Sequence, residues 1–201
     1  MVSGQISGAV VGQVVGKVSD TVSGLRQRLQ WDAEQGTVHD GPRRYLLMRP
    51  DVLMGAIAAL DAPLRAAVLE ALAQSTQQHG ARSLQAYAEQ APGDDVALIA
   101  ATVQAAADLG WGRWVIRREG QQSLTLEVSD SPFVAGWRAA TQSDVDAASD
   151  GVLGDPICAP IRGMFSALAE IVLKAPVQAQ ECHCAADDEA SVCRFVARIQ
   201  A

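Results

Sequence analysis

The hydrophobic period of this chain changes at Gly110, and that change limits the folds open to it. Before this glycine, apolar residues recur every three to four positions, which is the period of a helix buried along one side. After it, the segments RWVIRRE and SLTLEVS alternate apolar and polar residues, as half-buried strands do. Helices first and an antiparallel sheet later predict an α+β fold.

Three helices are predicted before the change of period. The segment 50–60 begins with a proline, which suits a first helical turn, and 94–109 opens with two acidic residues and stops at Gly110. The segment 63–78 also has the helical period. Its expected buried face consists of Leu64, Val68, Leu69 and Leu72.

The second half of the chain predicts two hairpins around one helix. The first hairpin turns at Gly120, and the second joins strands 176–182 and 191–198. Between them, after SPFVAGW and a polar loop over 141–155, Asp155 is the expected cap of a helix that has Pro156 in its first position. The expected buried stripe of that helix is Ile161, Met164, Phe165, Leu168 and Val172.

The N-terminal segment has a different character. Gly4, Gly8, Gly12 and Gly16 recur every four residues, so a helix there would offer a face of small residues to another backbone. Because glycine disfavours helices, a flexible tail is an equal alternative. We therefore divide the chain into residues 1–40, a helical dimerising or flexible segment, and 41–201, a ligand-binding domain, and expect a homodimer.

Composition excludes some classes of function. The 201 residues are 49% hydrophobic, enough to bury one substantial core, and the net charge of −7 comes without any lysine or arginine run that could track a phosphate backbone. Nucleic-acid binding is thus excluded. The N-terminus has neither a secretory signal nor the ~20 consecutive apolar residues of a membrane span, so we expect a cytoplasmic protein.

The segment ECHCAADDEASVC, residues 181–193, holds three of the four cysteines. The last hairpin is expected to gather Glu181, Cys182, Cys184 and Cys193 at one end, with Cys158 at the start of the preceding helix. Three thiolates and a carboxylate would form a closed, structural zinc shell. The spacing alone leaves open ordinary buried thiols, or an iron–sulfur cluster on all four cysteines.

The segments GDPICAPIRGMFSALAEIVL and VQAQECHCAADDEASVCRFVAR resemble the C-terminal half of the 4-vinyl reductase domain family. Together with LGWGRW and SPFVAGW, the resemblance covers roughly residues 95–198. It implies zinc ligation by Cys158, Glu181, Cys184 and Cys193, and it leaves Cys182 outside the shell. The predicted fold is therefore α+β with a zinc-stapled C-terminal hairpin.

With RRYLLMRPDVLMG near the N-terminus, the whole chain resembles the members of that family that serve bacteriochlorophyll biosynthesis. This resemblance implies a photosynthetic bacterium and a magnesium porphyrin as ligand. It also implies two partners, the large subunit of magnesium chelatase and the methyltransferase that follows it, and a place in the cytoplasm or at the surface of the photosynthetic membrane.

The family label names a reductase, but the residues favour a carrier. A vinyl reductase needs a hydride donor, and GWGRWV lacks the third glycine of the dinucleotide motif and precedes a strand rather than a helix. Zinc supplies no redox chemistry. We therefore predict a tetrapyrrole carrier, with a 4-vinyl (8-vinyl) reductase of divinyl protochlorophyllide and a small-molecule sensor as alternatives.

Aromatic side chains are the expected walls for a flat ligand, because large flat molecules pack well against them. The candidates are Tyr45, Trp111, Trp114, Phe133, Trp137 and Phe165. Plain core packing is the competing interpretation for each of them. His39 is the candidate axial ligand of magnesium, and the arginines beside Tyr45 are candidates to meet propionate groups.

Overall fold

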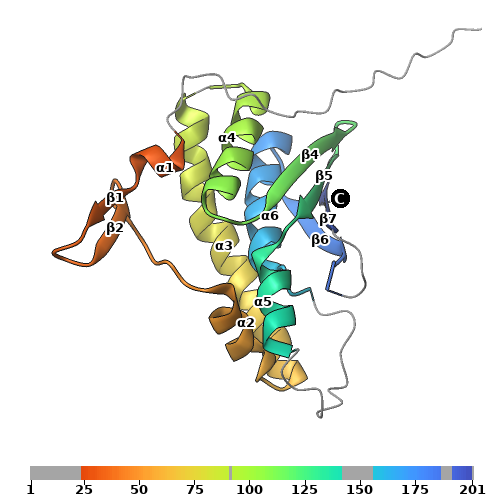
Figure 1. The fold of residues 1–201 in the computed structure, drawn as a ribbon. Helices are drawn as coiled ribbons and strands as arrows, with labels where there is room; N and C mark the ends of the chain where they lie inside the picture. The colour runs from red at the N-terminus through yellow and green to blue at the C-terminus, as the bar shows by residue number, and fades with distance from the viewer. Residues whose placement is uncertain (1–23, 91, 142–155, 187–191, 201) are drawn as a thin grey trace, which may run out of the picture.

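The computed structural model describes residues 24–90, 92–141, 156–186 and 192–200. The fold is α+β, as predicted. The strands form two separate antiparallel sheets, and helices lie between them (Figure 1). The elements are α1 (Leu25–Arg28), β1 (Gln30–Asp32), β2 (Thr37–Asp40), β3 (Arg43–Tyr45), α2 (Pro50–Ala58), α3 (Ala62–Gln90), α4 (Asp95–Asp108), β4 (Arg113–Glu119), β5 (Ser123–Ser129), α5 (Pro132–Thr141), α6 (Ala159–Leu173), β6 (Val177–His183) and β7 (Val192–Ile199).

The main sheet has the strand order β4-β5-β7-β6, with every pair antiparallel. Helix α6 packs on one face of this sheet, and α3 packs on α6 with α4 beside it (Figure 1). The core lies between α6 and the sheet, where Phe165 and Leu168 meet Leu126 and Phe195, all fully buried. The predicted stripe of α6 is buried as expected, except that Met164 is only half-buried.

Helix α3 and helix α6 approach each other most closely at two glycines. A Cβ on Gly163 would lie 2.1 Å from the carbonyl oxygen of Ala73, and a Cβ on Gly80 would lie 2.9 Å from Met164. Helix α3 continues to Gln90, although the sequence predicted an end at Gln78. Gly80 weakens α3 locally, but because it has no side chain it also leaves room for Met164 of α6.

Three short strands form a second sheet, which we call the arm (residues 30–45). The sequence predicted a short extended segment at RRYLLMRP, residues 43–50, but no sheet here. The strand order of the arm is β1-β2-β3, and β2 and β3 pair from Asp40↔Arg43 to Val38↔Tyr45. The Arg28 guanidinium fastens the arm to α3, because it donates hydrogen bonds to Asp40 at 3.2 Å and to the Tyr87 hydroxyl at 3.0 Å.

The structure corrects one expected helix boundary and adds one helix that was not predicted. Helix α6 begins at Ala159 rather than Pro156, with Cys158 as its N-cap and Pro160 in the first turn, where a missing N–H costs nothing. The segment SPFVAGW, which had no predicted element, forms most of α5. The expected cap Asp155 and the Gly4–Gly16 face lie outside the described residues. Nowhere in the described part of the chain is a helix both long and apolar enough to span a bilayer.

Candidate functional site

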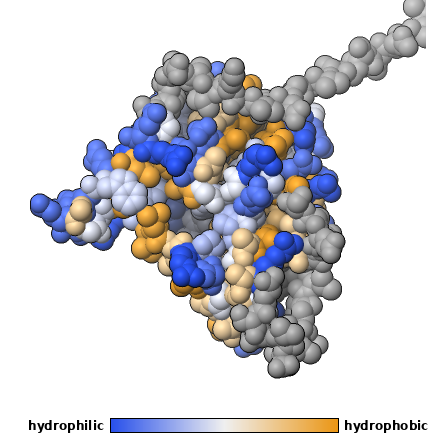
Figure 2. Space-filling model, in the orientation of Figure 1, coloured by the Kyte–Doolittle hydropathy of each residue, from blue (hydrophilic) through white to orange (hydrophobic). Residues whose placement is uncertain are grey.

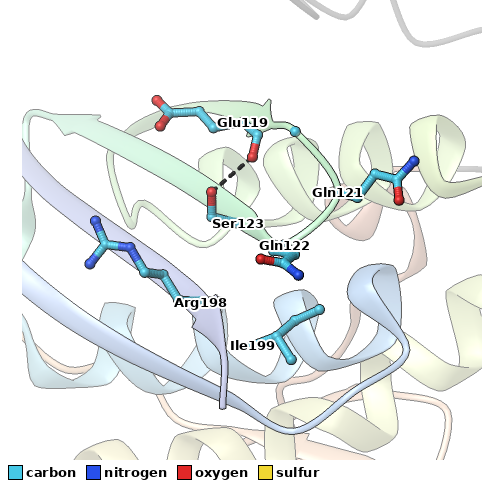
Figure 3. Close-up of a pocket in the computed structure, with 7 residues that line it drawn as sticks. Glu119, Gln121, Gln122, Ser123, Arg198 and Ile199 are labelled. Atoms are coloured by element: carbon cyan, nitrogen blue, oxygen red, sulfur yellow. Dashed lines mark hydrogen bonds between the residues drawn. The ribbon is translucent and has the colours of Figure 1, made fainter. Parts of the chain in front are cut away.

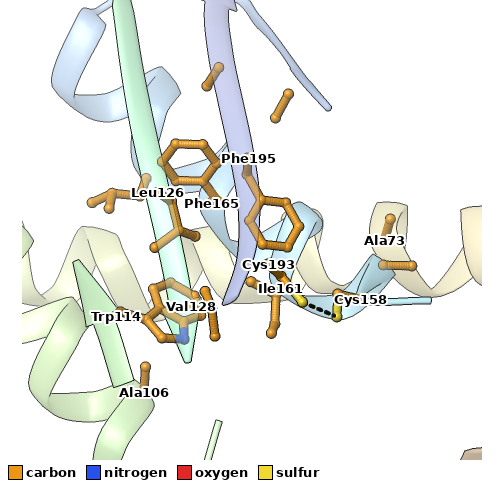
Figure 4. Close-up of a cluster of buried hydrophobic side chains, with 14 of the residues drawn as sticks. Ala73, Ala106, Trp114, Leu126, Val128, Cys158, Ile161, Phe165, Cys193 and Phe195 are labelled. Carbon is orange, nitrogen blue, oxygen red and sulfur yellow. Dashed lines mark hydrogen bonds between the residues drawn. The ribbon is translucent and has the colours of Figure 1, made fainter. Parts of the chain in front are cut away.

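Four potential metal ligands meet at one end of the main sheet. Cys158 precedes α6, Cys193 lies in β7, and Glu181 and Cys184 lie at the end of β6. One ligand atom from each of the four residues can be chosen so that all lie within 4.8 Å of one another. The Sγ atoms of Cys158 and Cys193 are 3.6 Å apart (Figure 4), close to the ~3.8 Å edge of a tetrahedron of sulfurs around zinc. These are the four residues implied by the sequence resemblance.

A β-bulge in β6 makes this arrangement possible. Glu181 pairs with Phe195, and His183, two residues later, pairs with Arg194, so Cys182 is the extra residue. In a regular strand, residues three apart point to opposite faces. Because the bulge interrupts the alternation, Glu181 and Cys184 both reach the metal centre. Cys182 is exposed, and its thiol donates to the carbonyl oxygen of Arg194.

Crowding and burial shape the acid–base properties of the cluster. Desolvation raises the pKa of Glu181 to about 7, helped by the negative charge of Cys193. Hydrogen bonds from the thiols of Cys158 and Cys184 lower the pKa of Cys193 to about 3, so this sulfur is a thiolate. A hydrogen bond with Cys184, a second one with Cys193, and burial raise the pKa of Cys158. The thiolate of Cys193 thus accepts hydrogen bonds from the thiols of Cys158 and Cys184, which keep their protons.

The residues present fit a zinc ion. Oxygen Oε1 of Glu181 is buried without a hydrogen-bond partner among the described residues, and a cation would satisfy it. The backbone N–H of Ala185 donates to the Cys193 sulfur at 3.3 Å, a contact that would orient this sulfur toward a bound metal. Three sulfurs and one oxygen fill a four-coordinate shell, so the centre suits a structural role. An iron–sulfur cluster on all four cysteines does not fit, because Cys182 points away.

Two residues in or next to α5 contact the cysteine cluster or the hairpin that carries it. The Ser131 hydroxyl lies 3.3 Å from the sulfur of Cys158, and Arg138 of α5 donates to the carbonyl oxygen of Ala185 in the ligand hairpin. Both contacts join segments far apart in sequence. The centre therefore links α5, α6 and the final hairpin.

A cavity of about 330 Å³ lies between α3, α4, α6 and β4, with α1 and β3 on one side. Its volume is near the lower end of the ~300–1,000 Å³ range of small-molecule sites. Its aromatic lining residues are Tyr45, Tyr87, Trp111 and Trp114, and its other lining residues are Leu25, Ser75, Thr76, His79, Gly80, Ser83, Leu84, Thr102, Ala105, Ala106, Leu109 and Met164.

Several polar groups of this cavity are hydrogen-bonded within the protein. The hydroxyls of Thr76 and Thr102 donate to carbonyl oxygens one turn earlier in their helices, and the Trp114 Nε1–H donates to the carbonyl oxygen of Trp111. The imidazole of His79 is exposed and has no hydrogen-bond partner among the described residues, and the hydroxyls of Ser75 and Ser83 have none there either. His79 is the lining residue whose side chain could also bind a metal.

The structure sorts the predicted pocket residues into two groups. Tyr45, Trp111 and Trp114 line the cavity. Phe165 is fully buried in the core instead, and Phe133 packs edge-on against Trp111 with ring centroids 5.7 Å apart, one layer behind the wall.

Two further predicted residues, Trp137 and His39, do not line this cavity. Trp137 lies on α5 with the Arg65 guanidinium 5.7 Å from its ring. His39 lies in β2 of the arm, where it pairs with Arg44. The histidine that lines the cavity is His79. A signal for the missed residues was present: Thr76, His79, Ser83 and Tyr87 recur at the helical period, which predicts one shared face of a helix.

A second hollow, of about 540 Å³, lies at the turn between β4 and β5 (Figure 3). It is larger but shallow, and its polar lining residues Glu119, Gln121, Gln122 and Arg198 are exposed. The one contact among its labelled side chains is local, from the Ser123 hydroxyl to the carbonyl oxygen of Glu119 at 2.9 Å. It offers no enclosed surface to a ligand, so the smaller aromatic cavity is the better candidate.

The fold is shared with a known ligand-binding domain. The chain is similar to the phenol-responsive sensory domain of the transcription activator PoxR, whose structure contains phenol, with a TM-score of 0.69, 15% identity, and coverage of 87% of this chain and 86% of that one. Trafficking protein particle complex subunit 3 from Naegleria fowleri, covalently bound to palmitic acid, gives a TM-score of 0.49 at 10% identity, with coverage of 76% and 95%. No protein-family model matches the sequence, and no curated protein does. The comparison with PoxR thus shows that the two chains share a fold.

Proposed function

We propose that this protein binds a flat, largely apolar small molecule in the cavity between α3 and β4, and that it carries this molecule rather than transforms it. The observation behind the proposal is the wall of the cavity. Trp111, Trp114 and Tyr87 gather around one space in a chain that has only 4% aromatic residues. Aromatic rings provide large, rigid faces for flat ligands.

The proposed ligand is a magnesium porphyrin, because the whole chain resembles the bacteriochlorophyll-biosynthesis protein BchJ in sequence. His79 is the proposed axial ligand, since a neutral imidazole binds metals and this one is available in the cavity. A porphyrin is larger than the cavity, so part of it would lie outside. The arm offers a continuation: Trp31 and Val38 stand in one row with Tyr45 across its three strands.

The same face of the arm suits the propionate groups of a porphyrin. Arg43 precedes Tyr45 by two residues in β3, and alternate residues of a strand share a face. Arginine binds carboxylates through paired hydrogen bonds. We propose that the carrier receives its ligand from the large subunit of magnesium chelatase and delivers it to the methyltransferase that follows. In this proposal zinc is the ion of the Cys158 cluster, and it stabilises the hairpin.

A small-molecule sensor is the second candidate. The observation that favours it is the cavity volume of about 330 Å³, which suits a single aromatic ring better than a macrocycle. The fold shared with a phenol-responsive domain agrees with this possibility. A vinyl reductase remains the third, and it requires a hydride donor brought by a nicotinamide or a partner.

Absorption titration of the purified chain tests the three candidates together. A carrier binds magnesium porphyrin with a shifted Soret band. His79→Ala removes the shift and weakens binding about tenfold or more, whereas the matched variant His39→Ala leaves both unchanged. If the chain bound simple phenols but no porphyrin, the result would favour a sensor over a carrier. Reduction of a divinyl substrate by the chain with NADPH would replace it with an enzyme.

A further inference from the structure

A short apolar segment, flanked by two arginines, directly follows a residue that lines the cavity. Tyr45 lines the cavity, and the next three residues, Leu46, Leu47 and Met48, are 77%, 74% and 51% exposed. Arg44 and Arg49 lie on either side of them and are exposed as well. We propose that residues 44–49, the docking segment, bind an anionic lipid surface and hold the cavity against it.

The apolar part of the docking segment is unusual for a free surface. Single exposed apolar residues are common, but three large ones in succession are a contiguous patch. Val52, in the first turn of α2, is 58% exposed, and Trp31, two strands across the arm from Tyr45, is 64% exposed. Figure 2 shows hydrophobic surface along the path between the protruding arm and α2, beside a hollow in this face.

Charge complementarity selects an anionic partner. The chain as a whole carries −7, yet residues 24–49 hold five arginines against the three acids Asp32, Glu34 and Asp40. Asp40 is held by Arg28, and Arg49 is paired with Asp51 just beyond the segment. Basic residues at headgroup level next to inserted apolar side chains are the usual composition of a peripheral lipid-binding segment.

The size of the patch favours a membrane over a protein. A stable protein interface uses about 20–30 residues on each side, and the docking segment with Trp31 and Val52 offers far fewer. A bilayer interface requires only a few side chains to insert, because the acyl region surrounds each one completely. Tryptophan is also favoured at the membrane–water boundary.

This inference deepens the proposed function, because a lipid-soluble ligand could then pass between membrane and cavity beside Tyr45. Lipid binding itself does not depend on the ligand. The two ideas are therefore tested separately, one with vesicles and no porphyrin, the other with porphyrin and no vesicles.

Flotation of the purified full chain with vesicles tests the inference. We expect binding to phosphatidylcholine vesicles that contain phosphatidylglycerol, weaker binding at high salt, and little binding to phosphatidylcholine alone. The triple variant Leu46→Ser, Leu47→Ser, Met48→Ser should lose at least about tenfold in partitioning. Arg44→Gln and Arg49→Gln should each lose about fivefold.

The matched control is Leu64→Ser with Val96→Ser, which replaces apolar residues that are 50% and 58% exposed elsewhere on the surface. It should float as the unchanged protein does, and circular dichroism should show that all variants are folded. Absence of flotation with anionic vesicles would overturn the inference. So would a triple variant that floats normally, or one that instead dissolves a dimer seen by light scattering. If the chain bound porphyrin but did not float with anionic vesicles, the lipid inference would fail and the carrier proposal would be unaffected.

Discussion

Trp114 of the cavity wall and Cys193 of the metal centre stand in one row of the main sheet, with Val128 between them (Figure 4). Neighbouring strands are about 4.8 Å apart, so roughly 10 Å separate the two backbones. Trp114 is 3% exposed and the other two are fully buried, so close packing joins them without a gap. A single residue, Val128, thus separates the cysteine cluster from the wall of the cavity in this row.

Removal of the metal should weaken ligand binding through this row. Coupling between two sites is typically about 1–3 kcal/mol, which corresponds to a roughly 5- to 150-fold change in affinity. We expect the dissociation constant of the cavity ligand to rise at least fivefold after chelation and to recover when zinc is restored. An unchanged constant in chelated protein that keeps its fold, measured by the same titration, would show that the two sites are independent.

Replacement of one metal ligand should destabilise the whole domain. Cys184→Ser should bind less than one equivalent of metal and lose about 4 kcal/mol or more of unfolding free energy, because the centre joins α5, α6 and the hairpin. Cys182→Ser is the matched control, since its sulfur is exposed. Elemental analysis and thermal denaturation measure both effects. Equal metal content and stability in the two variants would contradict the assignment of ligands.

Metal binding should release protons, and its affinity should fall as the pH falls. The raised pKa values of Cys158 and Cys184 mean that both thiols must lose a proton, whereas Cys193 is already a thiolate. At about pH 8 we expect release of about two protons per zinc. Below pH 7, where the Glu181 carboxyl with its pKa of about 7 also holds a proton, the number should approach three.

Calorimetry of zinc binding in two buffers with different ionisation enthalpies counts these protons. Glu181→Gln should remove the additional proton below pH 7 and leave the two thiol protons in place. A count that does not change with pH in the unmodified protein would show that Glu181 does not ligate the metal through a carboxylate that must first be deprotonated.

Two glycine substitutions should have opposite effects on stability. Gly163→Ala places a Cβ 2.1 Å from the Ala73 carbonyl oxygen, so α3 and α6 must separate, at a cost of about 1–3 kcal/mol. Gly55→Ala, also within a helix, meets only the Cβ of Ala140 at 3.6 Å, an ordinary contact. Because alanine favours helices, this second variant should be neutral or more stable by up to about 1 kcal/mol. Urea denaturation measures both, and equal midpoints would contradict the helix contact.

The elements that the sequence predicted well are those with several periods of hydrophobic pattern. Strand β5 alternates over seven residues and α4 has a capping aspartate, Asp94, whose side chain accepts from the Ala97 N–H. The arm was missed because strands of three and four residues contain too few alternations. The end of α3 was missed because a glycine normally weakens a helix, and only packing against Met164 shows why Gly80 is retained.

The site was predictable to different degrees in its two parts. The metal ligands came from a resemblance, since regular strand alternation would have placed Glu181 and Cys184 on opposite faces. The cavity was predicted in part, because aromatic identity does not say which side of an element a ring occupies. Phe165 is buried in the core beside the sheet, whereas Trp111 lines the cavity, although both are aromatic.

The bulge in β6 gives position 182 a role that belongs to its backbone alone. Its side chain faces solvent, so many residue types are compatible with the fold there. Its peptide unit, however, is the spacer that turns residue 184 inward. Deleting this one residue would restore regular alternation and rotate a ligand out of the cluster. Among homologous sequences, position 182 should therefore vary freely in identity while the length of the segment between Glu181 and Cys184 stays constant.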